Sequence, residues 1–124
     1  MRKHSKSMKS KFTSIENQFL NTFFSGLYIS ANEFIAIGAK VGLKMGMNTR
    51  ELLIKELLNK SDEQGNLGEV TKLLNDLVQA RIDEYNSLSR DYPAAAPILG
   101  ALAQKANSTR TLLAREQRGN PYEQ

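Results

Sequence analysis

The segment LGEVTKLLNDLVQARIDEYNSLSRDYP, residues 67–93, decides the fold class of this chain. Its apolar residues recur at intervals of three and four from Val70 to Leu88, which places them on one face of an α-helix. Pro93 ends the pattern, because a proline disfavours helix at the residue before it and suits the first turn of a new helix. We therefore predict a helix over about 67–90 and a second helix that starts near Pro93.

Residues that start or end helices elsewhere in the sequence also predict a helical fold. The helix that starts near Pro93 ends where Gly119 and Pro121 disfavour its continuation. Asn48, with Glu51 three residues later, predicts the capped start of a short helix over about 49–60. Alternating runs of β-branched residues, the mark of strands, are absent from the sequence. The predicted fold class is all-α.

The N-terminal third predicts one long helix. Thr13 and Glu16 have the spacing of a capping box, and apolar residues continue at helical intervals to Val41. About 30 residues of helix would be about 45 Å long. Gly38, Gly42 and Gly46 follow at four-residue spacing and allow two interpretations, which are close packing against another backbone or a simple helix end.

These helices predict a four-helix antiparallel bundle-like domain with one long, one short and two medium helices. The aromatic-rich band from Phe19 to Phe34 on the long helix is too broad for the two medium helices to cover. We therefore expect a homodimer that pairs the first helices of two copies. The monomeric alternative is that the short helix folds back over the band. The predicted interaction surface comprises Phe19, Phe23, Phe24, Leu27, Tyr28, Phe34, Gly38 and Gly42.

The distribution of charge divides the chain into a basic tail and a nearly neutral domain. Residues 1–11 hold five basic residues and no acid, whereas the rest of the chain has twelve basic and thirteen acidic residues. We predict a flexible basic tail over 1–11, a single helical domain over 12–118 and a C-terminal tail over 119–124. A start at Met8 instead of Met1 would remove three of the basic residues.

The basic residues also allow an alternative function, association with nucleic acid through the tail and the basic face of the last helix. Cations near a helix C-terminus are equally explained by the helix dipole, and no aromatic residue lies in the tail to stack on a base. The candidate phosphate-contacting residues are Arg2, Lys3, Lys6, Lys9, Lys11, Arg110, Arg115 and Arg118.

Composition closes most catalytic routes. The chain has no cysteine, and its one histidine, His4, lies in the tail, so we expect no cofactor, no metal site and no catalytic residue. Glu33 is the one residue that could support a catalytic role, because a carboxylate among apolar residues has a raised pKa when it is buried. A buried Glu33 needs a cation such as Lys40, Arg81 or Arg110, and the alternative is that Glu33 faces water.

The apolar stretch 19–39 is long enough to span a membrane, but Asn21, Asn32 and Glu33 disfavour a membrane span. The same region superficially resembles a signal peptide, although bulky Ile29 does not suit a cleavage site. The absence of cysteine fits a reducing cytoplasm. We expect a cytoplasmic, non-catalytic protein of adaptor, chaperone-like or structural type that binds protein partners through apolar helix surfaces.

Overall fold

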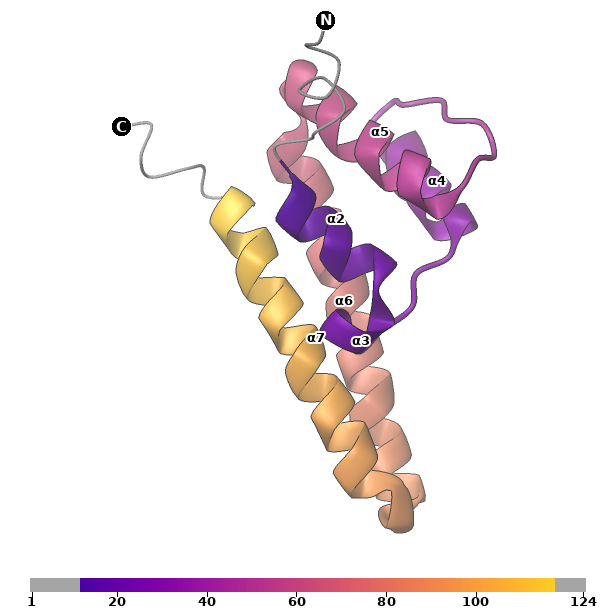
Figure 1. The fold of residues 1–124 in the computed structure, drawn as a ribbon, viewed down its shortest axis with the longest axis vertical. Coiled ribbons are helices and arrows are strands. Elements are labelled where there is room, and N and C mark those ends of the chain that lie inside the picture. Colours follow the sequence, from indigo (N-terminus) through magenta and orange to yellow (C-terminus); the bar gives the residue numbers. More distant parts are fainter. Residues whose placement is uncertain (1–11, 118–124) are drawn as a thin grey trace, which may run out of the picture.

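A computed structural model describes residues 12–117, in which every regular element is a helix and no strand occurs (Figure 1). The predicted all-α class is confirmed. The elements are α2 (Thr13–Leu20), α3 (Thr22–Ser25), α4 (Ala31–Lys40), α5 (Arg50–Glu63), α6 (Leu67–Asp91), the 3₁₀ turn η1 (Pro93–Ala95) and α7 (Ala96–Gln117).

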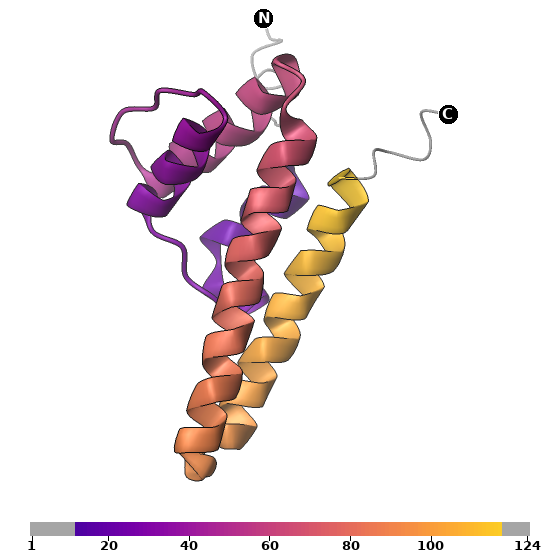
Figure 2. The same cartoon turned by 180° about the vertical axis from the view of Figure 1, so that it is seen from behind.

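The two longest helices, α6 and α7, form an antiparallel hairpin (Figures 1 and 2). Their boundaries confirm the helix predicted over 67–90 and the restart near Pro93, which opens η1. The apolar face of α6 contributes Val70, Leu74, Val78 and Ile82 to the core. Burial of each such side chain stabilises the fold by about 1.5–3 kcal/mol. The hairpin is therefore the frame on which the other helices pack.

The prediction of one long first helix is wrong, because the chain breaks twice between Thr13 and Lys40. Asn21 is extended, with φ −119° and ψ 101°, and ends α2. Gly26, which directly follows α3, has a φ of 74°. Residues with a side chain rarely adopt this backbone angle, and it ends the helix. Ser30 then caps a new helix, α4.

The helices before α6 cover part of the hairpin. In Figures 1 and 2, α2 and α3 lie against one face of α6 and α7, while α4 and α5 lie beside the first half of α6. Phe19 of α2 and Phe34 of α4 are fully buried and meet edge to face, with ring centroids 6.2 Å apart and an interplanar angle of 82°. A single core thus joins α2, α4, α5, α6 and α7.

The predicted caps differ from the observed ones in detail. Thr49, rather than Asn48, caps α5, since its side chain accepts a hydrogen bond from the Leu52 amide. At the start of α2, Phe12 occupies the cap position and makes no side-chain cap hydrogen bond. The predicted capping box of Thr13 and Glu16 is therefore wrong.

The glycine-rich stretch after α4 shows both expected effects at different positions. The helix ends at Lys40, and Gly42 turns the chain with a φ of 85°. A Cβ atom at Gly38 would lie 2.9 Å from Cε of Met45, so Gly38 allows the returning chain to pack on α4. Gly46 makes no such close contact, since no described atom beyond its chain neighbours would lie within 4 Å of a Cβ atom at this position.

These breaks remove the reason to expect a dimer through the first helices. The aromatic band is divided among short elements, and Phe19 and Phe34 within it are both fully buried inside the chain. The predicted tails, residues 1–11 and 119–124, lie outside the described residues, as does Arg118 at the predicted end of the domain.

Candidate functional site

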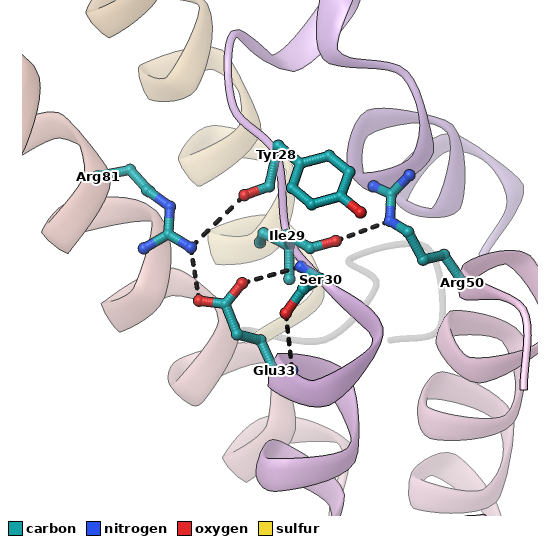
Figure 3. Close-up of polar contacts among 6 residues, drawn as sticks. All are labelled: Tyr28, Ile29, Ser30, Glu33, Arg50 and Arg81. Carbon is teal, nitrogen blue, oxygen red and sulfur yellow. Dashed lines mark hydrogen bonds and ion pairs between the residues drawn. The ribbon is translucent and has the colours of Figure 1, made fainter. Parts of the chain in front are cut away.

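The polar residues that meet at the linker between α3 and α4 form the first part of the candidate site (Figure 3). Ser30 and Glu33 make a reciprocal capping box at the start of α4. The Glu33 amide donates to Ser30 Oγ over 3.2 Å, and the Ser30 amide donates to Glu33 Oε1 over 2.9 Å. These bonds satisfy two amides that the first turn of a helix leaves unpaired, so they set where α4 begins.

Arg81 of α6 reaches the same carboxylate from the hairpin. Its Nη2 lies 2.5 Å from Glu33 Oε2 and 3.5 Å from the Tyr28 carbonyl oxygen (Figure 3). Of the three cations considered for Glu33, the structure selects Arg81. Each oxygen of Glu33 thus has a structural partner, one from Ser30 and one from Arg81.

The pKa of Glu33 follows from these contacts. Partial burial alone raises the pKa, but the Ser30 backbone hydrogen bond and Arg81 together outweigh burial and lower the pKa below its usual value of 4.5. A general acid at neutral pH needs a change in the opposite direction. Glu33 therefore has the electrostatics of a structural anion, and it is half-buried rather than fully exposed or enclosed.

Arg50 holds the other side of the linker. Its Nε donates to the Ile29 carbonyl oxygen over 2.7 Å, and its Nη2 donates to the Phe19 carbonyl oxygen over 2.6 Å. Its guanidinium carbon also lies 4.3 Å from the centroid of the Tyr28 ring (Figure 3). Arg50 thus ties α2 and the linker to the first residue of α5. No local motif in the sequence indicates these contacts.

A groove next to Glu33 forms the second part of the candidate site. It lies between α4 and α6, has a volume of about 330 Å³ and is open to solvent on one side. Its apolar walls are Ala36, Ile37, Leu73, Leu77 and Ala80, and its charged residues are Glu33, Lys40 and Asp76. We call it the α4–α6 groove. Its volume is at the lower end of the range for small-ligand sites.

The charged residues of the α4–α6 groove differ in their partners. Glu33 pairs with Arg81, and Asp76 pairs with Lys72 over 3.2 Å. Lys40 is exposed and has no ion-pair partner among residues 12–117. The groove therefore offers an apolar surface with one unpaired positive charge at its edge.

Four of the eight residues of the predicted interaction surface are buried inside the chain. The structure buries Phe19, Leu27, Phe34 and Gly38, so these residues offer no surface to a partner in this conformation. Tyr28 is 56% exposed, beneath Arg50, and Gly42 is exposed in the turn after α4. The backbones of Phe23 and Phe24 belong to α3, but their side chains lie outside the description.

The predicted phosphate-contacting residues are not brought together among the described residues. Arg110 is half-buried and its Nε donates to Asn75 Oδ1 over 3.1 Å, which ties α7 to α6. Arg115 is exposed in the last turn of α7. The remaining candidates lie outside residues 12–117, and they are Arg2, Lys3, Lys6, Lys9, Lys11 and Arg118.

Sequence reasoning missed a buried ion pair between α2 and α5. Glu16 is only 2% exposed, and its Oε1 lies 2.9 Å from Nζ of Lys55, whereas its Oε2 has no hydrogen-bond partner within residues 12–117. The signal in the sequence is that Glu16 follows Ile15 and precedes Phe19 on the apolar side of its helix. Because Lys55 is partly exposed, the pair connects the core to solvent.

Within residues 12–117, no group of three or more His, Cys, Asp or Glu side chains is arranged to hold a metal ion. In the same part of the chain, no helix combines the length and apolar character that a membrane span needs. Comparison with known protein families, curated proteins and solved structures finds no significant match to this chain.

Proposed function

We propose that this chain is a non-catalytic helical interaction protein that binds an amphipathic helix of a partner protein in the α4–α6 groove. The observation that carries the proposal is the groove itself, whose walls are apolar and whose edge carries an unpaired lysine, Lys40. Two exposed alanines, Ala36 and Ala80, stand in its walls. Their small side chains allow a third helix to approach closely.

The dimensions of the groove favour a short helical segment. From Glu33 to Lys40 the wall formed by α4 spans eight residues, about 10 Å at the rise of an α-helix. This length accepts about two turns of a partner helix, with apolar anchors at positions i, i+3 or i+4, and i+7. Lys40 adds a preference for a partner with an acidic residue next to its apolar face.

The absence of an assembled catalytic set in the described residues fits an interaction role. Both oxygens of Glu33 are engaged, by Ser30 and Arg81, and its lowered pKa disfavours proton donation. We propose an adaptor, chaperone-like or structural role in the cytoplasm, a compartment that suits a chain without cysteine.

A photocrosslinking amino acid in place of Ala36 tests the proposal in cells. Ala39 is the matched control, because it is also an exposed alanine of α4 but does not line the groove. We expect the probe at position 36 to capture one defined protein that the probe at position 39 does not capture. Equal capture at both positions, or salt-sensitive capture of nucleic acid instead of protein, contradicts the proposal.

A further inference from the structure

The free end of the α6–α7 hairpin carries an apolar surface that the rest of the described chain does not cover. Leu88, Tyr92 and Ile98 are 42%, 63% and 68% exposed. In Figures 1 and 2 this end of the hairpin projects beyond α2, α3, α4 and α5. We call the surface formed by Leu88, Tyr92 and Ile98 the distal face.

The distal face continues the face of the hairpin that α2 and α3 cover. The end of α3 meets the hairpin at Gly26, whose carbonyl oxygen accepts a hydrogen bond from the Tyr85 hydroxyl. A Cβ atom at Gly26 would lie 2.6 Å from the Leu102 carbonyl oxygen, so the chain at Gly26 also packs directly on α7. Leu88 follows Tyr85 by three residues, and Ile98 precedes Leu102 by four, which places both beyond Gly26 on the covered face. The face that α2 and α3 cover therefore continues to the end of the hairpin, where no described helix covers it.

The charge pattern of this end favours a second copy of the chain as the cover. Residues 92–104 contain no charged side chain. Two identical copies bring identical charges together, and like charges at close range destabilise an interface. A neutral apolar face avoids that repulsion. By contrast, the exposed side of α6 away from this face carries Lys72, Asp76, Asp83 and Arg90, which suits solvent.

The position of α2 and α3 restricts how two copies can meet. If both hairpins pointed in the same direction with their distal faces together, the α2 and α3 helices of the two copies would occupy the same space. An antiparallel arrangement about a twofold axis avoids this clash, because each free end then lies beside the α3 helix of the other copy. Two hairpins joined in this way form a four-helix bundle at their overlap.

We infer that two copies of this chain pair antiparallel through their distal faces. Beyond Tyr85 the face continues for seven residue steps to Tyr92, just past the end of α6, or about 10 Å. The buried area is therefore at or below the low end of stable interfaces, about 1,200 Å² in total. The dimer is accordingly a weak one, in the class of small transient interfaces.

Sedimentation analysis over a range of protein concentrations tests the inference on the full chain. We expect a shift from monomer to dimer in the micromolar range and at least a tenfold weaker dimer for Ile98→Glu, since an unpaired charge would enter the interface. Met47→Glu is the matched control, because Met47 is 67% exposed and lies away from the distal face. A chain that stays monomeric to about 1 mM, or a dimer that Ile98→Glu leaves unchanged, overturns the inference.

Crosslinking through single cysteines supplies a second, geometric test. The chain has no cysteine of its own, so Leu88→Cys introduces one thiol per copy. A short bismaleimide should join two Leu88→Cys chains but not two Met47→Cys chains, because the antiparallel arrangement brings the two copies of residue 88 near the axis. Equal crosslinking of both variants contradicts the arrangement. Ala36→Glu, in the α4–α6 groove, should leave the dimer intact, which separates this inference from the proposed function.

Discussion

Arg81 of α6 and Glu33 of α4 form an ion pair in which Nη2 lies 2.5 Å from Oε2. The same guanidinium also contacts the carbonyl oxygen of Tyr28. One side chain of the hairpin therefore positions both the linker and the first turn of α4. Since α4 forms one wall of the groove, this pair determines where that wall stands relative to α6.

Replacement of Arg81 by Gln should lower the free energy of unfolding by about 1 kcal/mol, because the pair is partly exposed and screened by solvent. Urea unfolding followed by circular dichroism measures this change. Lys72→Gln, which breaks the exposed pair with Asp76, is the control and should change stability by less than about 0.5 kcal/mol. Equal effects of the two variants would argue against a positioning role for Arg81.

The Glu33 pair should make stability depend on pH in the acidic range. Because the pKa of Glu33 in the folded chain lies below its usual value of 4.5, the carboxylate stabilises the fold fully above that value. This contribution is lost as the pH falls through the lowered pKa. The difference in unfolding free energy between the wild-type chain and Glu33→Gln should therefore shrink between about pH 5 and pH 3. A constant difference over this range would contradict the shift.

Tyr85 should show the opposite dependence at alkaline pH. Burial raises the pKa of Tyr85 above 10.0, although Arg81 partly offsets the effect. The folded chain therefore holds the proton more tightly, and the stability contributed by Tyr85 is lost as the pH rises above 10 through the raised pKa. Tyr85→Phe should cost about 1 kcal/mol at neutral pH, from the lost hydrogen bond to Gly26, and should weaken the alkaline decline. An alkaline decline that Tyr85→Phe leaves unchanged would contradict the raised pKa of Tyr85.

The ion pair of Glu16 and Lys55 should respond unequally to loss of its two members. Lys55→Met leaves a carboxylate buried without its cation, which costs about 3–5 kcal/mol, whereas Glu16→Gln leaves a lysine that reaches solvent and should cost less. The double variant should be more stable than Lys55→Met alone. Chemical unfolding of the three variants measures the order, and a double variant less stable than Lys55→Met would contradict it.

Two glycines with positive φ provide a matched test of packing. Gly26→Ala and Gly42→Ala both place a side chain in a conformation that costs about 1–2 kcal/mol. At Gly26 the new Cβ would also lie 2.6 Å from Leu102 O and 2.9 Å from Lys105 Cβ. At Gly42 no described atom beyond the chain neighbours would lie within 4 Å of the new Cβ. Gly26→Ala should therefore be the more destabilising variant by at least about 1 kcal/mol. Equal melting temperatures would mean that α3 does not pack closely on α7.

The helical hairpin could be predicted from the sequence because its signals are local. The apolar face from Val70 to Ile82 repeats at helical intervals, and Pro93 marks the turn. The breaks in the first predicted helix are less visible, since apolar residues continue at compatible intervals across Gly26. The capping box of Ser30 and Glu33 is a local signal that could have located the start of α4.

The contacts of the candidate site depend on tertiary structure, which explains why the sequence did not predict them. Arg50 and the Phe19 carbonyl are 31 residues apart, and Lys55 and Glu16 are 39 residues apart. No spacing rule connects such pairs. The groove is likewise lined by Ala36 and Ala80, two alanines with no functional signal in the sequence. They form one surface only because the fold places α4 beside α6.

The measurement that tests the central claim most directly is the affinity of the protein captured at position 36 for three forms of the chain. Isothermal titration should show wild-type binding, at least tenfold weaker binding by Ala36→Glu, and unchanged binding by Ala39→Glu, with all three forms equally helical. Because Ala36 is exposed, its replacement should not unfold the chain. Equal affinity for Ala36→Glu and the wild-type chain would contradict binding in the α4–α6 groove.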